Sequence, residues 1–294
     1  FASYDVSVPA SHRPGNQPRD ASDGSDPRTA FLPVAEHRFD SARSFARELG
    51  AEARAVGKGT GEVLVFVHGF NTNLNESLAR LAQLSTDFNL PAAPLLYAWP
   101  SDQRISAYEA DTERAVEASK GLRALVGDLV AAGTGRVILV GYSMGAETVL
   151  HALGEMQAAG EAGSFAKLDV VLLSPDVDVD SLRGLSTVRL PRPLVVFGSH
   201  DDLPLKLVSA LAHKGRPRLG ALSDPSLLSD IDLIYIDVAN VRQTGFGHIA
   251  VGDTPALIAA INAMPRPDLV GFATGRAAAI PGASVARHGR MTHV

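Results

Sequence analysis

The chain has 294 residues, of which 46% are hydrophobic and 20% are charged. This composition is ordinary for a folded globular protein and excludes a chain that is disordered throughout. The formal net charge of -5 argues against nucleic acid as a partner, because proteins that bind nucleic acid usually carry a basic surface. The absence of cysteine excludes disulfides, thiolate catalysis and zinc sites built from cysteine.

No apolar run approaches the roughly 20 residues that a membrane-spanning helix needs, so no such segment is expected. The first residue is Phe1 rather than Met. Two locations are compatible with this start: the periplasm or envelope after removal of an export leader, or the cytoplasm.

Residues 1–62 are expected to contain N-terminal strands, an irregular segment and a short helix that join the main sheet. Residues 4–8 alternate like a half-buried strand, and residues 30–39 are its expected partner. Residues 9–33 are rich in Pro, Ser, Asp, Gly and Arg, which predicts irregular structure.

Residues 63–264 are expected to form the catalytic core. Near-continuous apolar runs, typical of parallel strands covered on both faces, recur along this region. They lie at Val63–Val67, Pro94–Trp99, Val137–Val140, Val170–Leu173, Leu194–Phe197 and Ile231–Val238. Amphipathic helical segments separate them. This alternation predicts an α/β fold with an open, mostly parallel sheet and helices on both faces.

Two connections and the C-terminus complete the expected organisation. Residues 176–192 are too few for a large cap domain, so none is expected. Residues 203–230 are rich in leucine. We expect much of this segment to form helix packed on the sheet and part of it to line an acyl pocket. Residues 265–294 carry no acid after Asp268 and are rich in Ala and Gly, which favours a loosely ordered surface tail.

The sequence Gly141-Tyr142-Ser143-Met144-Gly145 follows an apolar run directly and precedes a helical segment. This G-x-S-x-G motif is weak by itself, but its place between strand and helix is typical of a nucleophile on a strained turn. Glycines are needed there because larger side chains would collide with the neighbouring strand and helix. Ser143 is therefore the candidate nucleophile, with a serine in a tight structural turn as the alternative.

A serine needs a base, and His248 is the candidate. It follows the last expected strand in a glycine-rich loop ahead of the final helix. The base in turn needs a carboxylate at a strand end. We prefer Asp202, with Asp201 and then Asp176 as alternatives. Asp237 lies within a strand and is expected to be structural.

An oxyanion hole requires backbone N–H groups aimed at the developing charge. The N–H of Met144, at the helix start, is one candidate. The second is the N–H of Phe70, with Asn71 as its substitute, in the loop after Val63–Val67. Candidate substrate-binding residues beside this region are Asn71, Tyr142, Trp99 and Tyr97, and packing in the core is the alternative for the last two.

No metal and no cofactor are expected. Asp176, Asp178 and Asp180 resemble the start of a calcium loop, but Ser181 and Thr187 stand where that loop needs Gly and Glu. The chain also lacks a phosphate-binding or dinucleotide-binding glycine motif in the required context.

These residues resemble the α/β-hydrolase superfamily, and more closely a bacterial branch of serine-esterase-like proteins of largely unassigned function. The resemblance rests on Val67-His-Gly-Phe-Asn71-Thr-Asn, Arg80-Leu-Ala-Gln83, Tyr97-Ala-Trp-Pro-Ser101, Gly141–Gly145, Ser174-Pro-Asp-Val-Asp178 and His248. It covers residues 2–264 and implies a serine hydrolase with an eight-stranded sheet. Gly141-Tyr142 departs from the Ala-His of that branch, whereas the position of Leu205 favours Asp202 over Asp201.

Together these features predict hydrolysis of a small-molecule or lipid-like carboxylic ester through an acyl-enzyme. Two alternatives remain from the sequence. One is a non-catalytic envelope or binding protein on the same fold, because a fold does not dictate a function. The other is a thioesterase or acyltransferase that uses the same triad.

Overall fold

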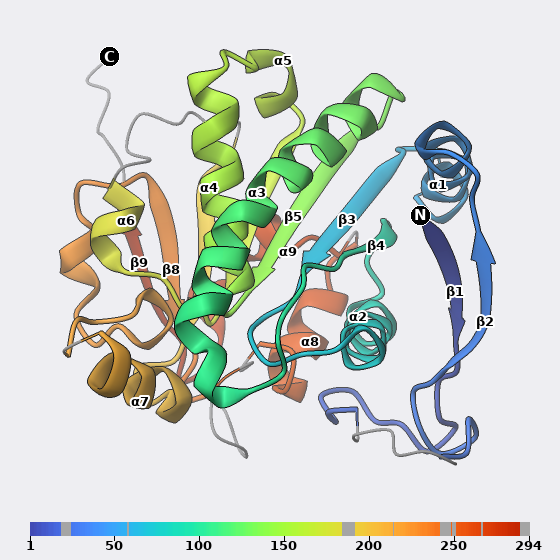
Figure 1. Ribbon diagram of the computed structural model, residues 1–294. Helices are drawn as coiled ribbons and strands as arrows, with labels where there is room; N and C mark the ends of the chain where they lie inside the picture. The colour runs from blue at the N-terminus through green and yellow to red at the C-terminus, as the bar shows by residue number, and fades with distance from the viewer. Residues whose placement is uncertain are drawn as a thin grey trace.

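The computed structural model describes residues 1–18, 25–57, 59–183, 192–213, 215–241, 248, 251–265 and 267–288. Strands and helices alternate along much of the chain (Figure 1). The strands are β1 (Ala2–Val6), β2 (Pro33–Arg38), β3 (Glu62–Val67), β4 (Ala93–Tyr97), β5 (Arg136–Tyr142), β6 (Leu168–Leu173), β7 (Leu194–Gly198), β8 (Leu233–Asp237) and β9 (Ser284–His288). The α-helices are α1 (Ala42–Val56), α2 (Leu74–Phe88), α3 (Tyr108–Ala131), α4 (Gly145–Ala158), α5 (Ala162–Phe165), α6 (Val179–Arg183), α7 (Leu203–Ala212), α8 (Pro255–Asn262) and α9 (Leu269–Gly275). Short 3-10 turns are η1 (Ile105–Ala107), η2 (Leu219–Ala221), η3 (Pro225–Leu228) and η4 (Ala277–Ala279).

The main sheet has the order β4-β3-β5-β6-β7-β8-β9 within the described residues. The strands from β4 to β8 are parallel, and β9 pairs antiparallel with β8. The carboxyl ends of the parallel strands therefore share one edge, where the loops that follow β3, β5 and β7 can meet. The α/β fold with an open, mostly parallel sheet that the sequence predicts is confirmed.

Both faces of the sheet are covered, which explains the continuous apolar runs. Val63, Val65 and Val67 of β3 face a core shared with α1, α3 and α4. Leu64 and Phe66 face the opposite core, shared with α2, α8 and α9. Figure 1 shows α3 and α4 in front of the sheet and α8 and α9 behind it. The side chains on both faces of the strand are thus buried.

The N-terminal strands differ from the expectation that they join the main sheet. β1 and β2 pair only with each other, as a separate two-stranded antiparallel sheet. Their side chains are mostly half-buried or exposed, unlike those of β3, so they lack the two apolar faces that a place inside the sheet requires. The main sheet consequently has seven strands among the described residues rather than the eight that the resemblance implies.

The C-terminal region also differs from expectation, because residues 267–288 belong to the core rather than to a loose tail. α9 buries Val270, Phe272 and Ala273 completely, and β9 extends the sheet beyond β8. The apolar residues between the small ones anchor α9, whereas a Cβ added at Gly275 would meet nothing within 4 Å. Residues 289–294 lie outside the described part of the chain.

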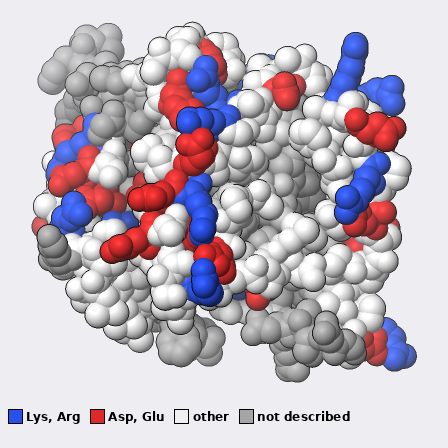
Figure 2. All heavy atoms as spheres, viewed as in Figure 1, with Lys and Arg blue, Asp and Glu red and all other residues white. Residues whose placement is uncertain are grey.

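Acidic and basic side chains are interleaved over the face that Figure 2 shows, and they do not gather by sign. Along α3, Lys120 pairs with Glu117 at 2.9 Å and Arg123 pairs with Glu161 at 2.6 Å.

Across the described residues, no helix combines the length and the apolarity needed to cross a bilayer.

Candidate active site

Ser143 lies in a sharp turn between β5 and α4. Its backbone φ is 51°, in the left-handed region that residues other than glycine rarely adopt. A Cβ added at Gly141 would lie 2.8 Å from the Cα of Ala146, and one at Gly145 would overlap the carbonyl oxygen of His68. Only glycine fits at these two positions, so the glycines of the motif are explained by the tightness of the turn.

The fold brings three side chains together that are distant in the sequence. The Oγ of Ser143 lies 2.9 Å from Nε2 of His248. Nδ1 of the same ring lies 2.9 Å from Oδ2 of Asp202. Ser143 is 6% exposed and Asp202 is fully buried, whereas the side chain of His248 is 23% exposed. The three groups form one continuous hydrogen-bonded chain at the carboxyl edge of the sheet.

Asp202 and its neighbour Asp201, the first alternative for the acid, make different contacts. The second carboxylate oxygen of Asp202 accepts the N–H of Leu205 at 3.0 Å, which caps α7 and fixes the side chain. Asp201 instead accepts the hydroxyl of Ser199.

Asp176, the other alternative, belongs to a buried cluster behind the turn. It accepts the hydroxyl of Tyr108 at 2.7 Å and Nε of Arg218 at 2.6 Å. Its backbone N–H donates to the carbonyl oxygen of Ser143 at 3.1 Å. Asp176 and Arg218 are each 3% exposed, so the pair supports the turn from within the protein. No motif marks Arg218 in the sequence, and only the fold reveals its partner.

Glu147, in the first turn of α4, extends this cluster. Burial raises the pKa of Glu147 to about 7, although the guanidinium of Arg218, 3.9 Å away, acts in the opposite direction.

No group of three or more His, Asp or Glu side chains in the described ranges is arranged to hold a metal ion.

The loop after β3 lies directly against the candidate nucleophile. A Cβ added at Gly69 would lie 2.9 Å from the Cβ of Ser143. Among the described residues, the backbone N–H groups of Phe70 and Met144 bind no acceptor. One unpaired amide thus lies in the loop and the other lies in the turn, close to where the two segments meet.

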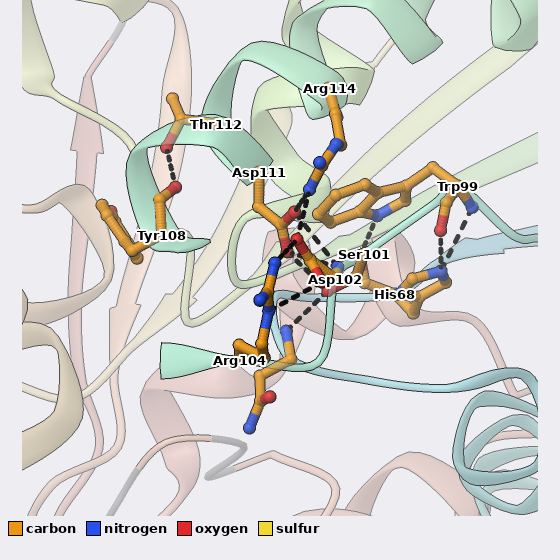
Figure 3. Close-up of polar contacts among 10 residues, drawn as sticks. His68, Trp99, Ser101, Asp102, Arg104, Tyr108, Asp111, Thr112 and Arg114 are labelled. Carbon is orange, nitrogen blue, oxygen red and sulfur yellow. Dashed lines mark hydrogen bonds and ion pairs between the residues drawn. The ribbon is translucent and has the colours of Figure 1, made fainter. Parts of the chain in front are cut away.

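A network of polar contacts holds this loop in place (Figure 3). The N–H of Asn71, whose φ is 55°, donates to Oγ of Ser101 at 2.8 Å. The hydroxyl of Ser101 donates to Asp111 at 2.7 Å, and the N–H of Asp102 donates to the same carboxylate at 3.0 Å. Asp111 is fully buried and also pairs with Arg114 at 2.5 Å. The carboxylate of Asp111 thus fixes the loop through an intermediate hydroxyl.

Trp99 and Tyr97 are packing residues, which corrects the expectation that they offer aromatic surface to a substrate. Trp99 is 3% exposed, stacks on His68 with ring centroids 5.2 Å apart, and donates Nε1–H to the carbonyl oxygen of His68 at 2.7 Å. The hydroxyl of Tyr97 donates to the carbonyl oxygen of Ala118 in α3 at 2.7 Å. A position near a strand end in the sequence does not show whether a ring points into the core or toward a substrate.

His68 shapes the loop, as its place after the first parallel strand suggests. Its Nε2 lies 3.1 Å from the N–H of Trp99, and its Nδ1 lies 2.9 Å from the carbonyl oxygen of Gly69. Burial lowers the pKa of His68, which favours the neutral ring.

A cavity of about 710 Å³ adjoins the turn. Tyr142 forms part of its wall, and the ring centroid of Tyr142 lies 5.3 Å from that of His248. Asn71 lines the same cavity. Further polar lining comes from the N-terminal segment, the start of α2 and the loop before η1, with Gln17, Asn73, Asn75, Glu76, Arg80 and Gln103.

The leucine-rich connection does not form a closed acyl pocket at α7. Leu205 is 1% exposed and packs inward. Leu203, Leu207 and Leu211 are 52%, 61% and 85% exposed and face solvent. Within α7, all of whose residues are described, Leu205 is the buried residue.

The family model for alpha/beta hydrolases of unknown function (DUF900) matches residues 44–257. A dienelactone hydrolase-like promiscuous phosphotriesterase from metagenomic libraries is 20% identical, with a TM-score of 0.29 over 49% of this chain and 58% of that protein. The chain thus spans less than two thirds of that structure. A Trichoderma reesei cutinase bound to a phosphonate inhibitor is 12% identical, with a TM-score of 0.25 over 56% of this chain and 67% of the cutinase. No curated protein matches the chain. Because the family model covers most of the sequence, the chain belongs to the alpha/beta hydrolase family DUF900.

Proposed function

We propose that this hydrolase cleaves carboxylic esters through an acyl-enzyme intermediate on Ser143. The observation that supports this best is the hydrogen-bonded chain from Ser143 through His248 to Asp202, with two contacts of 2.9 Å. A serine hydroxyl is a weak nucleophile unless a base accepts its proton, and an imidazole held by a buried carboxylate is suited to that task.

In the first step, Oγ of Ser143 attacks the ester carbonyl carbon while its proton moves to Nε2 of His248. Nδ1–H of the ring donates to Asp202, which stabilises the imidazolium that forms. The carbonyl oxygen becomes an oxyanion, and the N–H groups of Phe70 and Met144 bind it. One such donor is worth roughly 3 to 4 kcal/mol in the transition state.

The tetrahedral intermediate then expels the alcohol, which takes the proton from His248 and leaves the acyl group on Ser143. Water attacks this acyl-enzyme in the second step. His248 accepts a proton from the water and returns it to Oγ of Ser143, so the free carboxylic acid and the original enzyme result.

Two assays test the proposal. We expect the protein to hydrolyse phenyl acetate and to be labelled at Ser143 by a fluorophosphonate probe. Ser143→Ala should lower turnover about 10⁴-fold or more and abolish labelling. Ser119→Ala, in a buried serine of α3, is the matched control and should retain both properties. A protein that uses the fold only for binding would leave Ser143 unlabelled, and that result would overturn the proposal.

A further inference from the structure

We infer that the polar cavity beside Tyr142 binds the alcohol portion of the ester, and that this portion is a neutral group with several hydroxyls, such as a sugar or another polyol. The inference rests on the proposed function, and it names the substrate class of the same site. A volume of about 710 Å³ is ample for a group the size of a monosaccharide.

The position of the cavity assigns it to the leaving alcohol rather than to the acyl group. Tyr142 immediately precedes Ser143 and lines the cavity, while its ring packs on that of His248 at 5.3 Å. The departing alcohol must take its proton from His248, so it leaves on the imidazole side of the nucleophile. Tyr142, which lines the cavity and contacts the imidazole ring, joins the cavity to that side.

The chemistry of the lining favours hydroxyl groups over hydrocarbon. The carboxamides of Asn71, Asn75 and Gln103 line the cavity, and within the described residues none of them has a hydrogen-bond partner. Each carboxamide both donates and accepts, as a hydroxyl does. An alkyl group placed against them would strip them of water without replacing its hydrogen bonds, which is unfavourable.

The charges of the lining favour a neutral group. Arg80 is already paired with Asp253 at 3.2 Å and bonded to Gln83 at 2.9 Å. The carboxylate of Glu76 accepts the N–H of Asn73 at 2.7 Å within the capping box of α2. The guanidinium of Arg80 thus already has a carboxylate as its counter-charge, and the N-terminus of α2 offsets part of the charge of Glu76. Neither a phosphate nor an ammonium group therefore gains a strong counter-charge here.

The backbone of two of the three carboxamide residues is held in place before any ligand binds. Asn71 and Gln103 each have φ of 55°, in the left-handed region, which asparagine tolerates better than glutamine does. The network in Figure 3 maintains this geometry, because Asp111 binds Ser101 and Asp102 on one side of Gln103 and reaches Asn71 through Ser101. A rim fixed in this way suits recognition of a group with several directional hydrogen bonds.

The test compares two acetates whose alcohols have similar rings and differ in their hydroxyls: methyl 6-O-acetyl-glucopyranoside and cyclohexylmethyl acetate. We expect wild-type kcat/KM to favour the sugar ester by about tenfold or more, as one or two extra hydrogen bonds would give. Asn75→Leu and Gln103→Leu should each lower this ratio about fivefold. The ratio is measured within each variant, so a partial loss of folded protein does not affect it. Asn240→Leu, at an exposed asparagine beyond β8, is the control and should keep the wild-type ratio.

An equal or lower rate on the sugar ester, or ratios unchanged by both leucine variants, would overturn the inference. Phenyl acetate distinguishes this outcome from failure of the proposed function. If wild-type protein hydrolyses phenyl acetate but does not prefer the sugar ester, only the substrate class is wrong. If it hydrolyses none of the three esters, the ester hydrolase itself is wrong.

Discussion

The two oxygens of the Asp202 carboxylate make two separate contacts, one with His248 and one with the N–H of Leu205 at the start of α7. Asparagine caps helices about as well as aspartate, but its amide can present an N–H donor to His248 and favour the wrong tautomer. Asp202→Asn should therefore lower kcat about 10⁴-fold with little change in stability. Ester hydrolysis and urea unfolding of the same sample measure the two effects.

Asp201→Asn is the matched control for this change, because Asp201 is the neighbouring carboxylate and contacts Ser199 instead of His248. It should leave kcat within about twofold of wild type. A large loss in Asp201→Asn with full activity in Asp202→Asn would transfer the acid role to Asp201.

Glu147 should make stability depend on pH. Its folded-state pKa is raised from 4.5 to about 7 by burial, so between these values the unfolded chain loses the proton while the folded protein keeps it. Stability therefore falls as pH rises through this window. In Glu147→Gln that fall should be smaller by up to about 3 kcal/mol, measured by urea unfolding at about pH 5 and about pH 7.5.

Glu117→Gln, at an exposed position of α3, should leave the pH dependence as in wild type. If Glu147→Gln also leaves it unchanged, then Glu147 is ionised in the folded protein throughout the window, and the account of its burial is wrong.

Single residues differ in how far the sequence identifies them. The neighbouring strand and helix mark Ser143, and the loop after the last parallel strand marks His248. Asp202 and Asp201 are both compatible with the sequence, because only the conformation of the turn decides which carboxylate points to the ring. Arg218 and Asp111 carry no motif, and their importance follows from contacts with distant residues.

The loop after β3 depends on contacts from the loop before α3, and Ser101 joins the two (Figure 3). Ser101→Ala removes the acceptor of the Asn71 N–H and leaves the buried Asp111 carboxylate without one donor. We expect kcat to fall about tenfold, with a smaller change in KM, because a displaced loop misplaces the Phe70 amide mainly in the transition state. Steady-state kinetics with phenyl acetate provide the measurement.

Thr112→Ala is the control for this element. Its hydroxyl donates to the carbonyl oxygen of Tyr108 within α3 at 3.0 Å and does not contact the loop. Equal effects of Ser101→Ala and Thr112→Ala on kcat would show that the network does not position the loop.

Elements buried on both faces were the most predictable. Six apolar runs correspond to β3 through β8, because a parallel strand between two helical layers needs continuous apolar sequence. The orientation of Tyr97 and Trp99 was not predictable from the sequence, since an aromatic ring at a strand end can turn toward the core or toward a ligand.

At the scale of the molecule, the C-terminal region closes one side of the sheet. Asp268 caps α9 and pairs with Arg136 at 2.9 Å and with Arg192 at 2.7 Å, which ties this region to the starts of β5 and β7. Phe272 of α9 is fully buried. Phe272→Ala should cost about 3 to 5 kcal/mol of stability, measured by urea unfolding.

Phe1→Ala is the control, because Phe1 is 62% exposed, and it should cost less than about 1 kcal/mol. Similar unfolding midpoints for Phe272→Ala and wild type would mean that α9 is not part of the cooperative core.

The sequence predicted the class of fold but not the elements at the edges of the sheet. Composition rich in Ala and Gly suggested a tail, whereas α9 and β9 pack against β8 and the sheet. Likewise, β1 and β2 were expected in the main sheet but form their own. Edge elements depend on a few long-range contacts, which a local pattern does not encode.

The proposed mechanism requires Ser143 to carry the acyl group during turnover. Rapid acid quenching of the enzyme with phenyl acetate, followed by peptide mass spectrometry, detects this intermediate itself. We expect one acetyl group on the peptide that contains Ser143, and none on the same peptide of Ser143→Ala. Hydrolysis of the ester with no acetylation at Ser143, or acetylation at another residue, would contradict it.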